Sequence, residues 1–251
     1  MKEKVYVYIG RFQMAHAGHE EVLKHAVQHA DRLVLLVGSS DIARDPKNPF
    51  TFEERKSVLE AMTQRIASEE WSKGRSVTIN ILPIHDYTYN NTKWLKEVQK
   101  QVQSVTKSTD ITLAGCRKEG DTSTFYLDFF PHWKQDFIEE LKLYRTDIDS
   151  MEIIEAQGAL SSTRLRSQFF STKQVPEGLP QETTEFLEKF KVRNSDVLDN
   201  LVKEHNFVVS YRKQMMETLP YTNIPFLTGD SLVVCAGHVL LVKRLPIWRW
   251  A

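Results

Sequence analysis

The sequence predicts an α/β protein: a Rossmann-like parallel sheet, followed by helices and a short β-rich tail. Short apolar runs alternate with amphipathic helical stretches from Val5 to Gly115, as in chains of repeated β-α units. A loop bounded by Gly10 and Gly18 separates the first strand from the first helix. Since 251 residues with 41% hydrophobic content can bury a sizeable core, we expect at least one full domain.

The first three elements form a β-loop-α-β unit. Val5–Ile9 is short and rich in β-branched and aromatic residues, which predicts a strand. A helix is predicted from His19 to about Ala30, where the apolar residues recur on one face. Leu33–Val37 is continuously apolar, as expected for a strand covered on both sides of a parallel sheet. This order is typical of Rossmann-like folds.

The remaining elements follow the same reading. A capping box at Thr51–Glu54 opens a helix that we expect to reach about Ile66. Further predictions are a strand at 77–84, a helix at 92–105, a strand at 111–114, a helix at 162–170, helical stretches over 184–219, and a hairpin of strands 231–236 and 239–242. Two prolines and a glycine between 174 and 181 indicate a boundary, which divides the chain into domains 1–180 and 181–251.

Composition excludes several classes of protein. The 33 basic and 33 acidic residues balance, which argues against a general nucleic-acid binder. No apolar run approaches the roughly 20 residues of a membrane span, and the N-terminus lacks the apolar stretch of a signal peptide. The two cysteines provide neither a disulfide framework nor a metal cluster. We therefore expect a soluble cytoplasmic protein without nucleic-acid or membrane partners, and the sequence leaves open whether it forms a homo-oligomer.

The loop from Gly10 to His19 is the clearest functional signal. It follows a strand and enters a helix, the place where a doubly wound sheet binds nucleotide phosphates. Gly10 would let the backbone approach a ligand, and His16 and His19 can donate hydrogen bonds to phosphate oxygens. The alternatives are two surface histidines or a metal pair, the latter weakened by the absence of a nearby third ligand. The motif is not a Walker loop, because no Gly-Lys-Ser/Thr follows.

The second signal lies at the start of the helix that begins near Ser161. Hydroxyls and unpaired amides at a helix start form an anion site, and Arg166 lies one turn further in, where it can reach the same phosphate. The alternative is an ordinary basic helix with a Ser/Thr cap. The pair of motifs is much more specific than either one alone.

These motifs together resemble the nucleotidylyltransferase superfamily of α/β-phosphodiesterases. The strings Gly10–Gln13 and Asn48–Arg55, Pro83–Asp86 followed by Trp94, Ser123–Leu127 and Phe130–Trp133 narrow the resemblance to nicotinamide mononucleotide adenylyltransferases of the form fused to a Nudix hydrolase. The resemblance covers nearly the whole chain. It implies transfer of AMP from ATP to nicotinamide mononucleotide, which yields NAD and pyrophosphate.

The resemblance also implies a role for each site residue. His16, His19 and Arg166 would be catalytic, and the ATP-binding residues would be Gly10, Arg11, Phe12, Gly18, Ser162 and Thr163. The mononucleotide would be bound by Lys47, Asn48, Asp86 and Trp94. Lys47 stands where related enzymes often have arginine, and Met14 replaces a common proline, which would loosen the turn. Trp94 is equally well interpreted as a helix anchor beside Leu95 and Val98. No protein metal site is implied, and Mg²⁺ would be bound mainly through the ATP phosphates.

The tail resembles the first strands of a Nudix domain, at 230–234 and 237–244. The glycine-rich continuation and the glutamate-bearing helix of that family do not follow, and no acidic residue occurs after Ser231. We therefore expect no Nudix hydrolase activity, since that chemistry needs carboxylates to hold metal ions. Two alternatives to adenylyl transfer remain: another transferase of the superfamily, acting on pantetheine phosphate or with CTP, and a non-catalytic nucleotide sensor.

Overall fold

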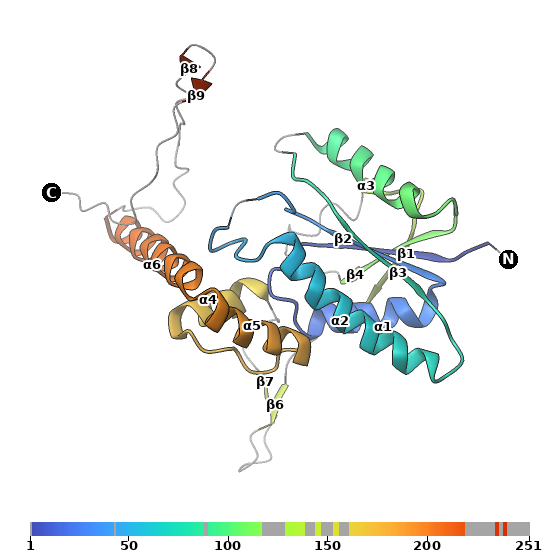
Figure 1. Ribbon diagram of the computed structural model, residues 1–251, viewed down its shortest axis with the longest axis horizontal. Coiled ribbons are helices and arrows are strands. Elements are labelled where there is room, and N and C mark those ends of the chain that lie inside the picture. The colour runs from blue at the N-terminus through green and yellow to red at the C-terminus, as the bar shows by residue number, and fades with distance from the viewer. Residues whose placement is uncertain are drawn as a thin grey trace.

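The structure is a computed structural model that describes residues 2–42, 44–87, 90–116, 129–138, 144–146, 153–155, 161–218, 234–235 and 238–239. Five parallel strands form the central sheet, in the order β3-β2-β1-β4-β5 (Figure 1). They are β1 (Val5–Gly10), β2 (Arg32–Val37), β3 (Thr78–Pro83), β4 (Ile111–Cys116) and β5 (Lys134–Ile138). The predicted Rossmann-like parallel sheet is confirmed.

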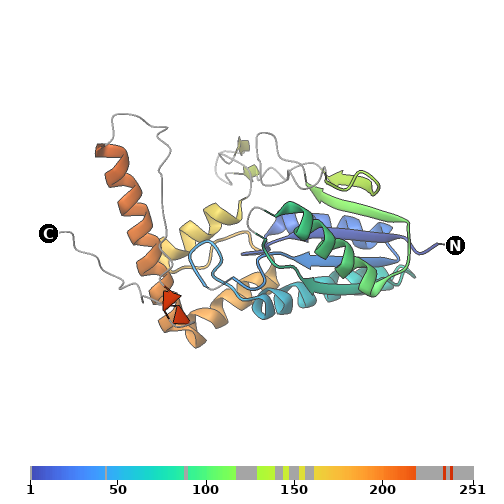
Figure 2. The ribbon, with the colours of Figure 1, turned by 90° about the horizontal axis from the view of Figure 1, so that it is seen from above.

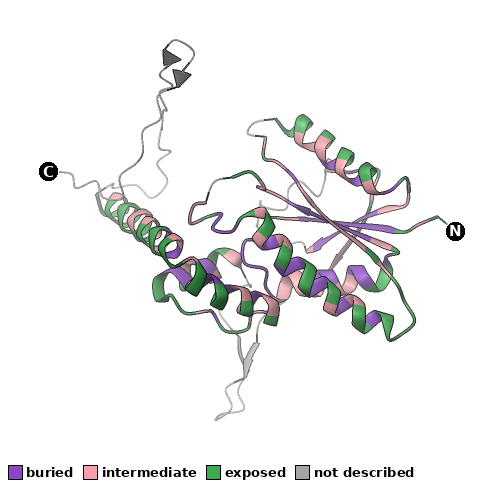
Figure 3. Ribbon diagram, in the orientation of Figure 1, coloured by how far each residue is buried: buried purple, intermediate pink, exposed green. Residues whose placement is uncertain are grey.

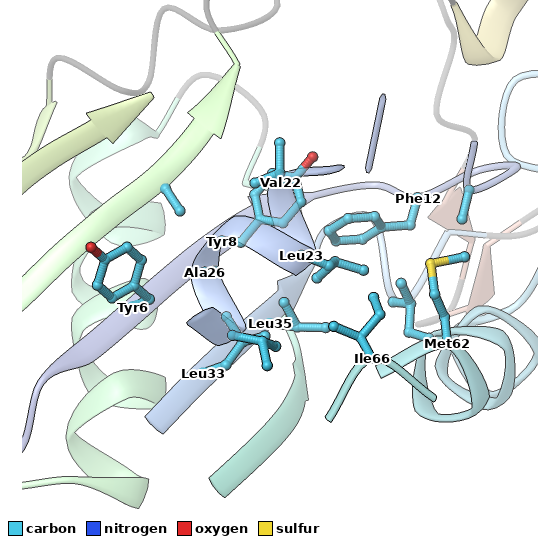
Figure 4. Close-up of a cluster of buried hydrophobic side chains, with 14 of the residues drawn as sticks. Tyr6, Tyr8, Phe12, Val22, Leu23, Ala26, Leu33, Leu35, Met62 and Ile66 are labelled. Carbon is cyan, nitrogen blue, oxygen red and sulfur yellow. The ribbon is translucent and has the colours of Figure 1, made fainter. Parts of the chain in front are cut away.

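Helices cover both faces of this sheet (Figure 1). On one face lie α1 (Ala17–His29) and α2 (Phe52–Trp71), and on the other lies α3 (Asn91–Val105). The inward residues of β1 alternate between the two cores, with Tyr6 and Tyr8 toward α1 and Val5, Val7 and Ile9 toward α3. Figure 4 shows the α1 side, where the ring of Phe12 lies beside Tyr8 and Leu23. Strands β1 and β2 are therefore buried on both sides, as the continuous apolar run at Leu33–Val37 predicted for β2.

The strand register brings several loops to one edge of the sheet. Gly10 pairs with Val37, and Val37 pairs with Pro83, so β1, β2 and β3 end level with one another. The order reverses at β1, because β2 lies on one side of it and β4 on the other. Ligands of open α/β sheets bind outside the carboxyl ends of the strands at such a reversal.

Three further helices lie beyond this edge: α4 (Ser162–Thr172), α5 (Gln181–Arg193) and α6 (Ser195–Thr218) (Figure 2). They share a third apolar cluster with Met14 and Phe50, which come from the loops after β1 and β2. On the other side of α5, Arg65 of α2 binds Glu182 at 2.7 Å and Glu20 of α1 at 2.8 Å. The burial pattern in Figure 3 shows the buried faces of α4 and α5 turned toward the body, while most of α6 is exposed or half-buried.

The predicted elements are confirmed with small shifts of their ends, and the capping box of α2 is present in both directions. Sequence reasoning missed β5 and the short antiparallel pair β6 (Tyr144–Thr146) and β7 (Ile153–Glu155). Of the predicted tail hairpin, the structure describes β8 (Val234–Cys235) and β9 (His238–Val239), which pair antiparallel; the rest of that prediction lies outside the described residues. None of the helices in the described ranges is long and apolar enough to cross a membrane.

Candidate active site

The loop after β1 begins with a close contact between its own residues. A Cβ placed on Gly10 would lie 2.9 Å from the ring of Phe12, so the space above this glycine is filled by that ring. Gly10 thus packs closely against Phe12 of its own loop, and its expected part in the close approach of a ligand stays a prediction. The carbonyl of Gly10 accepts a hydrogen bond from the amide of Gly38 at 2.9 Å, which joins the loops after β1 and β2.

His16 and His19 form a reciprocal cap at the start of α1. His16 is the N-cap residue, and its Nδ1 accepts a hydrogen bond from the amide of Gly18 at 3.2 Å. Nδ1 of His19 accepts from the amide of His16, also at 3.2 Å, and the two ring centroids are 3.9 Å apart. His16 is only 7% exposed, so it is not the surface histidine of the alternative reading.

This cap fixes the tautomer of both rings. A neutral imidazole whose Nδ1 accepts a hydrogen bond carries its proton on Nε2. Each ring is therefore a donor through Nε2, at a helix N-terminus where the helix dipole favours an anion. Gly18 contributes because a Cβ there would lie 3.1 Å from the His16 ring. The arrangement fits the predicted phosphate-binding role.

The middle of the same loop is anchored from both sides. The side-chain amide of Gln13 donates to the carbonyl of Phe50 and accepts from the amide of Phe50, each at 3.0 Å. Met14 next to it is buried in the third apolar cluster with a φ of 74°. Because proline is locked near a φ of about −65°, a proline at position 14 could not adopt this backbone conformation. The expectation that methionine loosens the turn stays a prediction.

Helix α4 contacts the same loop, although it lies about 150 residues further along the chain. The guanidinium of Arg166 donates to the carbonyl of Gln13 at 2.8 Å, and the hydroxyl of Ser162 donates to the carbonyl of Met14 at 3.2 Å. The side chain of Ser161 caps the helix, as the ordinary capping interpretation proposed, but Arg166 points inward and is 5% exposed. Thr163 is exposed and accepts a second hydrogen bond from Arg166 at 3.2 Å.

A concentration of positive charge lies around Arg11. Burial, together with the charge of Arg11, lowers the pKa of both Arg166 and Arg55 to about 10, so both side chains remain protonated at neutral pH. Within the part of the chain that the structure describes, no carboxylate is hydrogen-bonded to either guanidinium. Arg11 itself is exposed, and its side chain passes over Gly38. An anion is the natural counter-charge for such a group.

Lys47 and Asn48 lie in the loop between β2 and α2. The carboxylate of Asp45 accepts from the amides of Lys47 and Asn48, at 2.7 and 2.6 Å, which fixes the turn that carries both residues. The side chain of Lys47 is exposed, whereas Asn48 is buried. Its Oδ1 has no hydrogen-bond partner among the described residues, which leaves a polar acceptor to be satisfied.

Asp86 and Trp94 lie at the far side of the same sheet edge. The hydroxyl of Ser39 donates to Oδ2 of Asp86 at 2.6 Å, so Asp86 is joined to the loop after β2. Trp94 is half-buried on α3, with its ring centroid 6.3 Å from that of Phe130, and it packs on the core beside Val98. These contacts fit the helix-anchor reading of Trp94. The motif segment 123–127 lies outside the described residues.

Three residues that sequence reasoning did not single out hold this site together: Gln13, Ser39 and Arg55. Gln13 and Arg55 end two of the strings that carry the resemblance, Gly10–Gln13 and Asn48–Arg55, whereas Ser39 lies outside every motif. The described residues contain no group of three or more histidine, cysteine, aspartate or glutamate side chains that could hold a metal ion. The site is thus one of N–H donors and cations.

Residues 7–168 match a family profile described as cytidylyltransferase-like, which spans more than half of the chain. The chain belongs to this family. Over 200 residues it is 28% identical to the nicotinamide/nicotinic acid mononucleotide adenylyltransferase of Acinetobacter baylyi, a match that covers 79% of the chain and 92% of that relative. A shorter match of 95 residues, 34% identical, links it to the nicotinamide-nucleotide adenylyltransferase of Archaeoglobus fulgidus and covers 38% of the chain and 52% of that protein.

This cytidylyltransferase-like chain is similar in structure to a bifunctional NMN adenylyltransferase/ADP ribose pyrophosphatase from Francisella tularensis. The TM-score is 0.68 at 26% identity, with 88% of the chain and 58% of the Francisella chain covered. A second structure of that protein, complexed with AMP and a manganese ion, gives a TM-score of 0.66 at 25% identity, with 87% and 57% covered. The chain thus spans a little over half the length of this bifunctional relative.

Proposed function

We propose that this protein transfers the AMP part of ATP to nicotinamide mononucleotide, giving NAD and pyrophosphate. The observation that carries the proposal is the joining of the two histidine rings and Arg166 through one loop at the carboxyl edge of the sheet. The predicted activity is also the one for which the curated relatives are named. It places the chain in NAD biosynthesis.

In this reaction a 5′-phosphate oxygen of the acceptor attacks the α-phosphorus of ATP. A new P–O bond forms as the bond to pyrophosphate breaks, and the leaving group takes the electron pair. No side-chain nucleophile is needed, so the contribution of the protein is positioning and charge stabilisation. Nε2–H of His16 and His19 would donate to phosphate oxygens, while Arg11 and Arg166 would offset the developing negative charge.

The divalent metal of this reaction would enter the site together with the nucleotide substrate. The donor set of the site consists of imidazole, guanidinium and hydroxyl groups, which suit phosphate oxygens rather than a hard cation. We propose Mg²⁺, held mainly by ATP oxygens, as that metal. It would neutralise phosphate charge beyond what the described side chains supply.

The acceptor side of the proposal rests on four residues. Lys47, whose side chain is exposed, and Asn48 would bind the phosphate or ribose of the mononucleotide. Asp86 would accept a hydrogen bond from the nicotinamide amide, and Trp94 would stack on the cationic pyridine ring, a contact worth up to about 2 kcal/mol when desolvated. Asp86→Ala and Trp94→Ala should then weaken binding of nicotinamide mononucleotide more than binding of ATP. Calorimetry that shows unchanged mononucleotide affinity in both variants would remove these two assignments.

The proposed activity is tested by incubating the full chain with ATP, Mg²⁺ and nicotinamide mononucleotide and measuring NAD and pyrophosphate in equal amounts. Parallel reactions with nicotinate mononucleotide and pantetheine phosphate, and with CTP in place of ATP, define the substrates. Turnover of pantetheine phosphate alone would reassign the enzyme within the superfamily. Tight ATP binding without turnover of any acceptor would identify a nucleotide sensor instead.

We also propose that the tail from about residue 231 is Nudix-like and that the first domain ends near residue 180. The antiparallel β8–β9 pair and the bifunctional nature of the Francisella relative support the first part. Because the glutamate-bearing helix of that family does not follow, we expect no Nudix hydrolase activity. Incubation of the chain with ADP-ribose and Mg²⁺ tests this expectation, and no enzymatic release of AMP is expected. AMP release that depends on this chain would show that residues outside the expected glutamate helix can support the hydrolysis.

A further inference from the structure

Arg55 lies in the first turns of α2 and is almost fully buried, with 3% of its surface exposed. Its guanidinium lies beneath the ends of β1 and β2. It donates to the carbonyls of Arg11 at 2.6 Å, Gly38 at 2.7 Å and Ser39 at 3.0 Å. Its Nε donates to the carbonyl of Thr51 at 3.2 Å. One side chain thus joins the loop after β1, the loop after β2 and the cap of α2.

The backbone that Arg55 binds is strained at two places. Phe12 and Ser39 each have a φ of 50°, in the left-handed region that non-glycine residues seldom adopt. Their preceding carbonyls, those of Arg11 and Gly38, are the two that accept from Nη1 of Arg55. Such conformations are unfavourable for non-glycine residues and persist only where the surroundings over-determine them. The guanidinium supplies that restraint at both positions.

The charge of Arg55 is also unbalanced locally. All four of its hydrogen bonds go to neutral carbonyls, and none of the described carboxylates forms an ion pair with it. Asp86 and Glu54 act on it only at longer range, and Arg11 opposes them. Because a cation in a poorly hydrated site is felt strongly by nearby anions, Arg55 adds positive potential behind the loop that carries the histidines.

We propose that Arg55 is a positioning residue for ATP: its buried guanidinium holds the strained ends of β1 and β2 in place and puts a fixed positive charge behind the phosphate-binding loop. The inference rests on the proposed function for the identity of the ligand. It goes further by making a side chain that meets no substrate atom a determinant of ATP affinity. Its link to the acceptor side runs through Ser39, whose hydroxyl donates to Asp86 at 2.6 Å, so acceptor binding should depend on Arg55 less than ATP binding does.

The test compares Arg55→Ala and Arg55→Lys in the full chain, with Arg32→Ala as the matched control. Arg32 lies at the amino end of β2, far from the site, and binds Glu3 at 2.8 Å and Asn80 at 2.7 Å. Affinities for ATP and for nicotinamide mononucleotide are measured by calorimetry, and KM and kcat by NAD formation, at a temperature where each variant is folded by circular dichroism. Millimolar guanidinium chloride, with equal ammonium chloride as the salt control, is then added to the Arg55→Ala protein.

We expect Arg55→Ala to weaken ATP binding by roughly tenfold or more, because it removes the charge-assisted hydrogen bonds that hold the phosphate-binding loop and the positive charge behind it. Mononucleotide binding should change by less than about threefold, and guanidinium, but not ammonium, should restore ATP affinity. Arg55→Lys keeps the charge but cannot form all four hydrogen bonds, so its ATP affinity should lie between those of the wild type and the alanine variant. Arg32→Ala should lose stability without losing ATP affinity.

Equal losses for ATP and for the mononucleotide, or ATP affinity within twofold of wild type in folded Arg55 variants, would overturn the proposal. If Arg55→Ala does not fold, Arg55→Lys is judged by the same ratio of the two affinities. ATP binding is read independently of turnover. A wild-type chain that binds ATP but makes no NAD would contradict the proposed function and leave the comparison of Arg55 variants intact.

Discussion

His16 and His19 occupy the two reciprocal positions of one helix cap, and the proposed function would give each ring a chemical task beside this structural one. The structural task is modest, since a lost N-cap interaction costs about 1 kcal/mol. The chemical task is larger, because a donor directed at developing charge contributes far more in a site that excludes water. The two tasks can therefore be separated by magnitude.

We predict that His19→Ala lowers kcat by about 10²–10³ while the protein stays folded. The matched control is His29→Ala in the last turn of the same helix, where Nδ1 contacts the carbonyl of His25 at 2.8 Å. Steady-state NAD formation and thermal unfolding are measured for both variants. If the His29 variant loses as much turnover as the His19 variant, the effect belongs to helix α1 and not to the ring of His19.

Met14 provides a second residue-level prediction. Met14→Pro should destabilise the fold strongly, because a φ of 74° lies outside the range of proline. Met14→Leu keeps the volume and the backbone freedom, so it should cost less than about 1.5 kcal/mol. Urea unfolding of the two variants compares these costs. Equal midpoints would mean that the turn tolerates a right-handed residue at position 14.

At the scale of elements, the junction of β3 and α3 carries an ion pair that depends on pH. Nδ1 of His85 lies 2.7 Å from Oε1 of Glu97, and this hydrogen bond raises the pKa of His85 above its ordinary value. Since the pKa is raised in the folded state, the stabilisation is fully present below the unfolded pKa of about 6.5 and is lost as the pH rises through the folded pKa. The pair should thus stabilise the fold more in mildly acidic solution than in alkaline solution.

We predict that Glu97→Gln lowers the pKa of His85 toward its ordinary value, as followed by NMR of the imidazole protons. The same change should reduce stability more at pH 6 than at pH 8.5. Lys93→Gln on the same helix is the control, because its amine contacts the ring of Tyr87 and not His85. A stability loss that is equal at both pH values would assign Glu97 a role that does not depend on the charge of His85.

The elements also show what the sequence could predict and why the rest escaped. The apolar strands and the capped helices were predictable because burial on both faces and cap chemistry leave local patterns, as at Leu33–Val37 and Thr51–Glu54. Strand β5 was not predicted, because it is an edge strand with polar residues whose partners lie on other elements. Asp136 accepts a hydrogen bond from Tyr6 of β1 at 2.8 Å and contacts His25 of α1 at 2.9 Å. Such partners are more than a hundred residues away, so no local pattern reveals them.

The site divides in the same way. The placement of His16 and His19 at a helix start was predictable because the two residues are neighbours in the chain, although their reciprocal cap was not predicted. The grip of Arg55 on three loops and the double hydrogen bond between Gln13 and Phe50 arise only when distant segments meet. The direction of Arg166, inward to a carbonyl, likewise depends on the loop that it meets. The roles assigned to Lys47 and Trp94 stay predictions.

At the scale of the molecule, α5 supports the loops that form the site. The ring of Phe190 is 2% exposed and meets the ring of Phe50 edge-on at 5.3 Å. Phe50 in turn holds Gln13 through its backbone. The helix that starts the predicted second domain is thus one side chain away from the phosphate-binding loop. The contact between Phe190 and Phe50 thus crosses the predicted domain boundary at residue 180.

We predict that Phe190→Ala costs about 3–5 kcal/mol of stability, as expected for a large ring removed from a core, and raises the Kd for ATP in the folded protein. Val192→Ala on the same helix is the control, because Val192 is 81% exposed and should stay within about 0.5 kcal/mol of wild type. Chemical unfolding and ATP calorimetry provide the two measurements. A destabilised Phe190→Ala protein with wild-type ATP affinity would separate α5 from the function of the loop.

The anchors of the site have a consequence for the timing of synthesis. Ser162 and Arg166 bind carbonyls 148 and 153 residues earlier in the chain. A ribosome that adds about 5–20 residues per second needs roughly 7–29 seconds to proceed from His19 to Arg166. Throughout that interval the nascent chain already carries both histidines but lacks the helix that fixes their loop. Nucleotide in the cell can therefore stabilise this protein only after most of it has been translated, so its early folding proceeds without help from its own substrate.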